Sequence, residues 1–281
     1  DRDRKMTVKT TTFIPCGAKL PIIALITSAL FGGAAWVAPS AYFLGVAAII
    51  VSGIMLKKTK RFAGEPAPFV MELPAYQMPT IGNVLRSMWE RGSSFIKKAG
   101  TIILLSSIVI WVGSTFGDTG SGFGFDPDME LDSSVLGKIG NAVKWIFAPL
   151  GFGNAKATIA TVMGLVAKEE VVGVFGVLDF EGLTKLAGYS FLVFNLLCAP
   201  CFAAMGAIKR EMNNAGWFWF AIGYQTIFAY VIALIVFQIG SIFVGSVNVI
   251  GLIIAIVLLI GLGYLLFRPY KESKSLDVKV K

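Results

Sequence analysis

The stretch WFWFAIGYQTIFAYVIALIVFQIG, residues 217–240, decides the fold class of this sequence. It contains no charged residue, and it exceeds the roughly 20 apolar residues that a helix needs to cross the hydrocarbon core of a bilayer. Trp217 and Trp219 at its start are typical of the aromatic belt at a membrane interface. We therefore predict a transmembrane helix over residues 217–240.

Other apolar stretches indicate further membrane helices. Residues 34–56 and 246–267 are long enough to span the bilayer, and 99–116 is slightly shorter. Two more stretches, 13–33 and 191–211, are apolar but are interrupted by proline, which removes a helical hydrogen-bond donor. We therefore expect the first three stretches to form continuous helices and the last two to form broken ones.

Two weaker stretches, 141–166 and 171–180, contain interspersed glycine and charged residues, which favours a re-entrant hairpin or tilted half-helices. The composition agrees with a membrane protein, because 56% of the residues are hydrophobic and only 15% are charged, against about a quarter in soluble domains. The predicted fold class is all-α: a polytopic integral membrane protein with about six transmembrane helices plus a re-entrant or broken-helix region.

Loop charges predict the orientation of the chain in the membrane. Basic residues follow the span 34–56 and precede the span 99–116, so we expect residues 57–98 on the cytoplasmic side. The acidic stretch 117–134 has no basic residue and is expected outside. The basic tail RPYKESKSLDVKVK is expected to keep the C-terminus in the cytoplasm. The predicted location is a membrane that the chain crosses several times, and the resemblance described below implies the cell inner membrane.

Charge and residue usage exclude several kinds of function. The net charge of +8 is explained by lysine and arginine in cytoplasmic loops, so we expect no nucleic-acid partner. The sequence contains no histidine, which excludes histidine metal sites, catalytic triads and proton relays within this chain. It also lacks a GxxxxGK[ST] motif, so it has no P-loop. We expect neither enzyme chemistry nor a permanently bound cofactor.

The two broken stretches share a local pattern. Residues 14–18 read IPCGA and residues 199–203 read APCFA, and a lysine follows each Pro-Cys pair, Lys19 and Lys209 respectively. Non-helical backbone at membrane depth persists only where it is buried or lines a cavity. Matching breaks in two parts of a membrane protein therefore point to a transport site.

Thiols at such breaks suggest a particular class of ligand. Thiolates are soft ligands that suit Cu(I), zinc and iron, so Cys16 and Cys201 could hold Fe(II) together with carboxylates and freed backbone carbonyls. The alternative is that the cysteines are small apolar residues that pack helices. Cys198 and Cys201 also form a CxxC pair, which in another context would indicate dithiol redox chemistry. These alternatives stay open at this point.

The residues Lys168, Glu169 and Glu170 interrupt an otherwise apolar run. Charges in such a run are costly in lipid, so they must face protein or water. One interpretation is that Glu169 and Glu170 are carboxylates on a cation path, near the tip of a re-entrant segment. The other is a solvated turn between two half-helices.

Several motifs of this chain occur together in one known family. They are FIPCGAKLP (13–21), PFVMELPAYQMPT (68–80), VLRSMWERGSSFIKKAGTII (84–103), GLVAKEEVVG (164–173) and CAPCFAAMGAIKRE (198–211), preceded by DRDRKMTV at the start of the chain. In this order they resemble the ferrous iron transport protein B family, FeoB. The resemblance covers essentially the whole chain.

The resemblance implies a prokaryotic inner-membrane importer of Fe²⁺ with two related gate regions. It identifies Cys16 and Cys201 with cysteines that contact the ion, places Cys198 near the second of these, and places Glu169 and Glu170 in a gate segment. Family members carry an N-terminal GTPase domain and a Gly-Cys-Asn-Val-Pro element, and this sequence contains neither. We therefore expect the C-terminal part of such a permease, with the first gate incomplete and no transport by this part alone.

With this resemblance, the chain divides into five expected segments. They are 1–56, the end of the first gate region with a broken helix and one span; 57–98, a cytoplasmic interfacial segment; 99–140, a span and an acidic external loop; 141–240, the second gate region; and 241–281, the last span and a basic cytoplasmic tail.

The expected partners are Fe²⁺ as substrate, the lipid bilayer, the N-terminal GTPase and first-gate half, and small Feo accessory proteins, with a homo-oligomer as a further option. GTP and Mg²⁺ are expected only at the GTPase domain. Two rival hypotheses stay open. One is a transporter of another substrate class with gate architecture, such as a nucleoside carrier, and the other is a membrane dithiol redox protein that uses Cys198 and Cys201.

Overall fold

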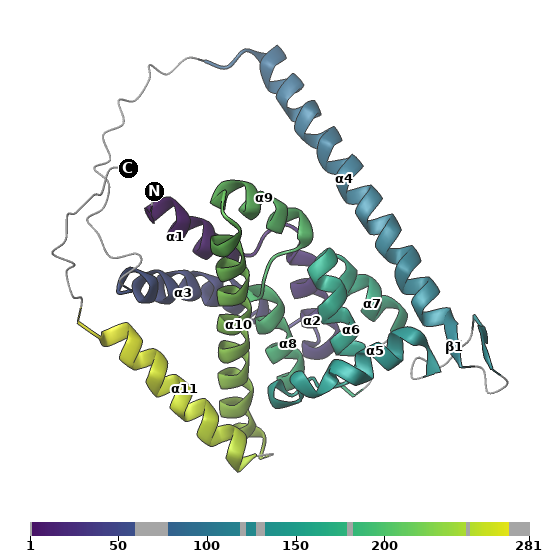
Figure 1. Cartoon of the computed structure of the whole chain (residues 1–281), viewed down its shortest axis with the longest axis vertical. Coiled ribbons are helices and arrows are strands. Elements are labelled where there is room, and N and C mark those ends of the chain that lie inside the picture. Colours follow the sequence, from purple (N-terminus) through teal and green to yellow (C-terminus); the bar gives the residue numbers. More distant parts are fainter. Residues whose placement is uncertain are drawn as a thin grey trace.

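The computed structural model describes residues 2–59, 78–118, 122–127, 133–178, 182–245 and 248–269. These residues form a helical bundle in which several helices pack around a central one (Figure 1). The central helix is α8 (Lys185–Leu197). It packs closely against α10 (Ala215–Val244), and it also contacts α2 (Leu20–Phe31) and α3 (Val37–Lys57).

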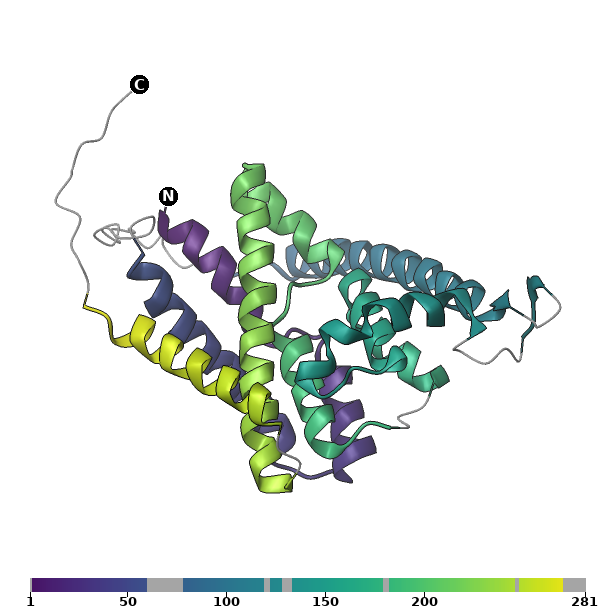
Figure 2. The same ribbon diagram turned by 60° about the horizontal axis from the view of Figure 1, so that its bottom comes forward.

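Burial distinguishes the centre of the bundle from its periphery. Every residue from 191 to 200 is buried, so the end of α8 and the chain that follows it are enclosed on all sides. In the most apolar part of Lys185–Met212, 61% of the residues are buried, against 11% in α11 (Val249–Phe267). A helix that is apolar all round is typical of a protein core or a membrane span. The two apolar helices therefore take different places, with α8 at the centre and α11 at the edge (Figure 2).

Side-chain caps set where five of the helices begin. Each capping oxygen accepts a hydrogen bond from a backbone N–H of the first turn, which otherwise has no intrahelical partner. The caps are Ser134 for α5 (Val135–Val143), Asn154 for α6 (Ala155–Val166), Thr184 for α8, Asn214 for α10 and Asn248 for α11.

Three of the predicted spans are confirmed as helices of the required length and hydropathy. The predicted spans 34–56, 217–240 and 246–267 correspond to α3, α10 and α11, and each is long and apolar enough to cross a membrane. The fourth stretch of this kind in the described residues is Lys185–Met212, which is a broken helix. The expected total of about six spans is not confirmed and stays a prediction.

Residues 99–115 of the predicted span 99–116 lie within α4 (Ile81–Thr115), a single helix of 35 residues, and Phe116 already belongs to the strand that follows. Much of this helix stands apart from the bundle, and its contacts are with α5, with α7 (Glu170–Leu178) and with the strand that follows it (Figure 1). Helix α4 therefore continues across the expected segment boundary at residues 98 and 99. The boundaries at 140 and 141 and at 240 and 241 likewise fall inside α5 and α10. Residues 60–77 of the expected interfacial segment lie outside the described residues.

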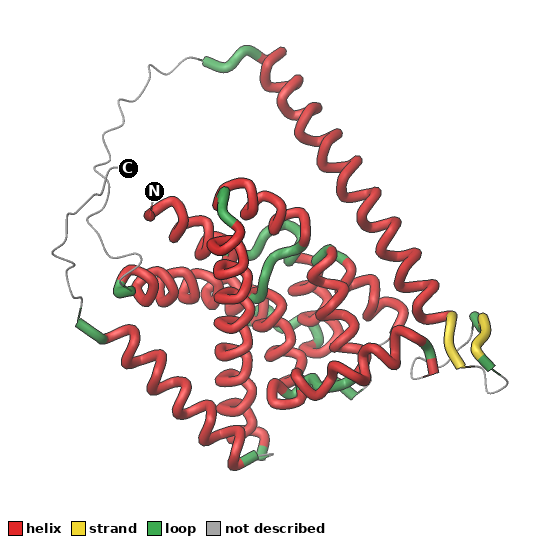
Figure 3. The backbone as a smooth tube through the Cα atoms, viewed as in Figure 1, coloured by secondary structure: helices red, strands yellow, loops and turns green. Residues whose placement is uncertain are grey.

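The described residues are mostly helical, as predicted, and a small hairpin adds two short strands. Strands β1 (Phe116–Asp118) and β2 (Phe123–Phe125) pair antiparallel, with Phe116 opposite Phe125 (Figure 3). The two rings lie 5.3 Å apart between centroids. The sequence FGDTGSGFGF explains the departure from helix, because glycine is a poor helix former and paired aromatic side chains stabilise cross-strand neighbours. The described residues are otherwise helical or irregular.

The two weaker apolar stretches form short helices, consistent with half-helices. Helices α6 and α7 have 12 and 9 residues, which at 1.5 Å per residue gives lengths of about 18 and 14 Å. A bilayer core is about 30 Å thick, so neither helix can cross it. They pack against each other and are joined by a short turn at residues 167–169.

The remaining elements are short and lie near the ends of the longer helices. They are α1 (Arg2–Thr10), the 3₁₀ turns η1 (Thr11–Phe13), η3 (Lys144–Ile146) and η4 (Ala148–Leu150), and α9 (Phe202–Met212).

Candidate functional site

The first predicted break lies between η1 and α2. Ile14 is extended, with φ −64° and ψ 132°, and Lys19 is the last residue before α2 begins. Pro21 stands in the first turn of α2, where its missing N–H costs no hydrogen bond. The backbone N–H of Lys19 donates to the carbonyl of Cys16 at 2.9 Å, which closes a tight turn. The predicted helix break at this place is confirmed.

The second predicted break separates α8 from α9. Cys198 and Cys201 are both extended, with ψ 172° and 162°, and Pro200 lies between them. The ring of Pro200 also disfavours helix at Ala199, so residues 198–201 cannot continue α8. Cys201 then becomes the residue immediately before α9. The break is therefore set by the CAPC sequence itself.

A third non-helical segment lies between α6 and α7. Ala167 is extended, with φ −145° and ψ 132°, and Glu170 begins α7. The N–H of Glu170 donates to the carbonyl of Ala167 at 3.1 Å, so residues 167–170 form a compact turn. We call the three non-helical segments 14–19, 167–169 and 198–201 the junction cluster.

Two lysine side chains join the parts of the junction cluster. The ammonium of Lys19 donates to the carbonyl of Leu196, in the last turn of α8, at 2.6 Å. The ammonium of Lys168 donates to the Cys198 thiol at 3.0 Å. Lys168 and all three cysteines also lie within electrostatic range of Lys19. The two Pro-Cys breaks and the Lys-Glu-Glu turn therefore meet in one region of the fold.

The predicted ligands differ in their exposure within this region. Cys16 is exposed, Cys201 is half-buried and Cys198 is buried, and all three are free thiols. Glu169 is half-buried, and Glu170 is 3% exposed at the start of α7. Among the described residues, no group of three or more cysteine, aspartate or glutamate side chains lies close enough to hold a metal ion. Their assignment as ligands stays a prediction.

Sequence reasoning missed one polar residue near the junction cluster. Asn195 is fully buried, one turn before Cys198 on α8. Its amide nitrogen donates to the carbonyl of Phe191, while its side-chain oxygen has no hydrogen-bond partner among the described residues. The sequence does contain a signal for this residue, because a single asparagine interrupts the apolar run FLVFNLLC. Buried polar groups usually find hydrogen-bond partners, so a lone one in such a run is a candidate site residue.

Neighbouring helices hold the first break in place. The amide nitrogen of Gln225, a fully buried residue of α10, donates to the carbonyl of Lys9 at 3.0 Å and to the Thr12 hydroxyl at 2.8 Å. The Lys19 ammonium donates to the carbonyl of the same threonine at 2.8 Å. On the other side, Gly45 of α3 lies against Phe13. The break is therefore positioned by α3, α8 and α10 together.

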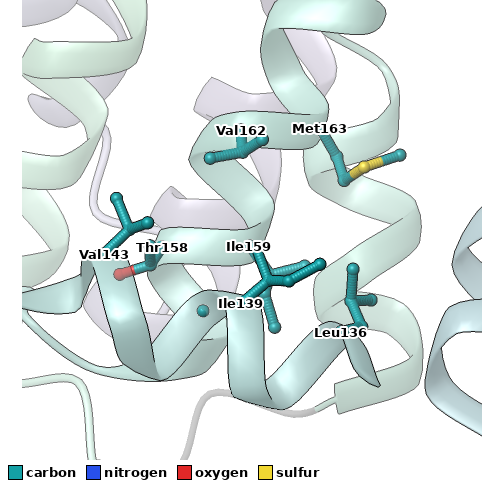
Figure 4. A pocket seen from close by; sticks show the side chains of 8 residues that line it. Leu136, Ile139, Val143, Thr158, Ile159, Val162 and Met163 are labelled. Atoms are coloured by element: carbon teal, nitrogen blue, oxygen red, sulfur yellow. The ribbon is translucent and has the colours of Figure 1, made fainter. Parts of the chain in front are cut away.

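A separate pocket between α5 and α6 does not belong to this site. It is lined mainly by aliphatic side chains such as Leu136, Ile139 and Val162, as Figure 4 shows. Its one hydroxyl, on Thr158, already donates to the carbonyl of Asn154 at 2.7 Å. The lining has no charged side chain and no thiol, so it is unsuited to a metal ion.

Comparisons with known proteins agree with the resemblance noted from the sequence. Residues 38–91 match the family model described as "Ferrous iron transport protein B C terminus". Residues 96–215 match the Gate model, described as "Nucleoside recognition". Among solved structures, none matches the chain.

The relatives of the chain are iron transporters by name. The "Fe(2+) transporter FeoB" of Methanocaldococcus jannaschii is 34% identical over 258 residues, which cover 86% of this chain and 38% of that protein. The protein of the same name from Staphylococcus aureus strain COL is 32% identical over 257 residues, covering 87% of this chain and 38% of the relative.

A third relative, from Porphyromonas gingivalis, is named "Fe(2+) transport protein A/Fe(2+) transporter FeoB fusion protein". It is 29% identical over 297 residues, which cover 86% of this chain and 35% of that protein. The chain thus spans less than two fifths of the length of these relatives. Its two family-model matches and its similarity over most of its own length show that the chain belongs to the ferrous iron transport protein B family.

Proposed function

We propose that this chain is the C-terminal part of a permease that moves Fe²⁺ across a membrane into the cytoplasm. The observation that carries the proposal is the junction cluster. Both Pro-Cys breaks meet there, next to the turn that carries Glu169 and Glu170. Broken helices at membrane depth provide free carbonyls and helix ends that can replace the hydration shell of an ion.

The residue types of the cluster suit Fe²⁺ better than a hard cation. Cys16 and Cys201 offer sulfur at the exposed and half-buried positions, where an entering ion would meet them first. Sulfur ligands favour iron, zinc and Cu(I) over Mg²⁺ and Ca²⁺. Cys198 lies deeper, and Glu169 and Glu170 add carboxylates on the adjoining turn. The Fe²⁺ ion, as the substrate, would pass from the outer thiols toward these carboxylates.

The chain would work with further parts of the same transporter. The resemblance implies an N-terminal GTPase and a first-gate half, and the relatives, which are more than twice as long as the segment matched here, have room for both. GTP and Mg²⁺ would act only at that GTPase. The fusion relative supports a small protein of the transport protein A type as an accessory partner. Assembly of several copies of the chain is a further part of the proposal.

The fold supports a membrane location with the C-terminus in the cytoplasm. Helices α3 and α11 end close together, because the Lys58 ammonium donates to the carbonyl of Leu266. Lys57 and Arg268 stand at these two helix ends. The turn that joins α2 to α3, the end of α10 and the start of α11 lie at the other end of the bundle (Figure 2). Basic residues mark the cytoplasmic side, so this end of the bundle would face the cytoplasm.

Uptake of radioactive Fe(II) by the assembled transporter tests the proposal. The variants Cys16→Ser and Cys201→Ser should each reduce the rate about tenfold or more, since loss of a residue that only supports a metal ligand already costs about 10–100-fold. Ser28→Ala is a matched control, since its exposed hydroxyl bonds only within its own helix α2. Uptake at the parental rate in both cysteine variants, with equal protein in the membrane, would show that the thiols do not carry the ion.

A further inference from the structure

We propose that the ammonium groups of Lys19 and Lys168 occupy the positions that a divalent cation would take in the buried part of the junction cluster. Because each ammonium is attached to the chain, we call the two groups tethered cations. The inference rests on the proposed function, since it concerns the same site. It assigns to the two lysines a task that neither the sequence motifs nor the comparisons assign: they keep the site closed to cations until the segments that carry them move.

Lys168 lies where a soft cation would bind. Its ammonium is 3.0 Å from the Cys198 sulfur, and the two residues are 1% and 2% exposed. Within the described part of the chain, this hydrogen bond is the only one that the ammonium makes, and it forms no ion pair there. A buried ammonium is costly unless it is paired, so a lysine aimed at a single thiol requires an explanation. Its position blocks the sulfur from any other positive ion.

Lys19 lies where a hard ligand would hold a cation. Its ammonium donates to the carbonyls of Leu196 at 2.6 Å and Thr12 at 2.8 Å, and the residue is 2% exposed. Leu196 is in the last turn of the half-helix α8, where free carbonyls and the helix dipole attract positive charge. Broken helices in transporters use such ends to coordinate cations. Lys19 therefore lies against the carbonyl oxygens of the site, and Lys168 lies against its sulfur.

The two lysines act on each other as like charges. Like charges in a poorly screened interior repel, so a divalent ion cannot join them without displacing at least one. The lysines sit on two separate turns, 14–19 and 167–169, which lead into α2 and α7. Movement of either turn would withdraw an ammonium and leave a sulfur or a carbonyl for the ion.

Metal binding by the purified 281-residue chain tests the inference. The probe is Co²⁺ alone, followed in detergent under reducing conditions by the absorption of cobalt–thiolate bonds. Lys168→Leu should raise the apparent affinity for Co²⁺ tenfold or more, and the rise should disappear in the double variant with Cys198→Ser. Lys168→Arg keeps the charge and should bind like the parent. Lys19→Leu should raise the affinity in the same direction, and it carries the test if Lys168→Leu is not monodisperse.

A matched control comes from the second break. Lys209 follows the CAPC sequence as Lys19 follows the first Pro-Cys pair, but it is exposed in the last turn of α9. Lys209→Leu should leave the Co²⁺ affinity unchanged. If the two lysines only stabilise the fold, replacing them should not raise the affinity for Co²⁺. An affinity that is unchanged or lower in both leucine variants, or a rise that persists without Cys198, would overturn the inference.

These outcomes are separate from the test of iron transport. A Cys198-dependent gain of Co²⁺ affinity, together with parental uptake in the Cys16 and Cys201 variants, would support the tethered cations and refute the proposed route of iron. Loss of uptake in those variants without any gain of affinity in the lysine variants would do the reverse.

Discussion

Replacing Gly45 by alanine tests how tightly the first break is held against α3. A Cβ atom at Gly45 would lie 2.8 Å from the carbonyl oxygen of Phe13 and 3.1 Å from Cδ of Pro15. Both separations are shorter than normal van der Waals contact. The obstacle is backbone and a proline ring rather than a flexible side chain, and Phe13 is fully buried. The break must therefore move away from α3, or α3 must shift.

The expected cost can be isolated with a control on the same helix. Overpacking of this kind typically costs about 1–3 kcal/mol. Alanine also favours helix over glycine, by about 0.5–1 kcal/mol in a helix interior. Gly53→Ala should show only this gain, because a Cβ at Gly53 meets nothing within 4 Å. Both variants gain the same helix propensity, so the comparison isolates the cost of overpacking. Gly45→Ala should therefore be less stable than Gly53→Ala by about 1–3 kcal/mol.

Two measurements on the purified chain check this prediction. Reversible unfolding in mixed micelles gives the difference in the free energy of unfolding between the two variants. The rate of maleimide labelling at the exposed Cys16 reports on the break itself and should change in Gly45→Ala only. Equal stability of the two variants, with equal labelling rates, would refute the close packing of α3 against the break.

Two further predictions concern the contacts of α1 and η1 with α10. Gln225→Leu removes two hydrogen bonds to the chain before the first break and should lower the free energy of unfolding by about 1–3 kcal/mol. The control is Thr226→Ala, whose exposed hydroxyl bonds within α10, and it should change the free energy of unfolding by less than about 0.5 kcal/mol. Equal effects of the two substitutions would contradict this prediction. The Lys9 ammonium lies 4.3 Å from the centre of the Trp217 ring, and a double-mutant cycle with Lys9→Ala and Trp217→Leu should give a coupling energy of about 0.5–2 kcal/mol. A coupling energy of zero would show that the contact contributes nothing.

Local sequence signals predicted the elements of this fold well. The three confirmed spans are long uncharged runs, and the two breaks follow from proline, whose effect on helix is local. The hairpin at Phe116 and Phe125 was missed, because the stretch was assessed by its acidic charge rather than by its glycine and aromatic residues. The full extent of α4 was missed as well, since the polar residues before 99 obscure a helix that continues through them.

The arrangement of the site was less accessible to sequence reasoning. The Pro-Cys pattern indicated two related breaks, but it contained nothing to say that Lys19 bonds to Leu196 or that Lys168 faces Cys198. These contacts join segments far apart in the chain, and their geometry is set by the packing of α2, α6, α7 and α8 as a whole. Asn195 could have been selected as a lone polar residue, although its unpartnered oxygen is visible only in the structure.

The contact between Lys19 and Leu196 has a consequence for the synthesis of the chain. The two residues are 177 positions apart, so the ribosome adds Lys19 about 9 to 35 s before Leu196, at roughly 5–20 residues per second. During this interval the Lys19 charge cannot be held by the end of α8. The first break must then wait in water, at the membrane surface or in the insertion machinery. The junction cluster can therefore be completed only after the second break has been synthesised.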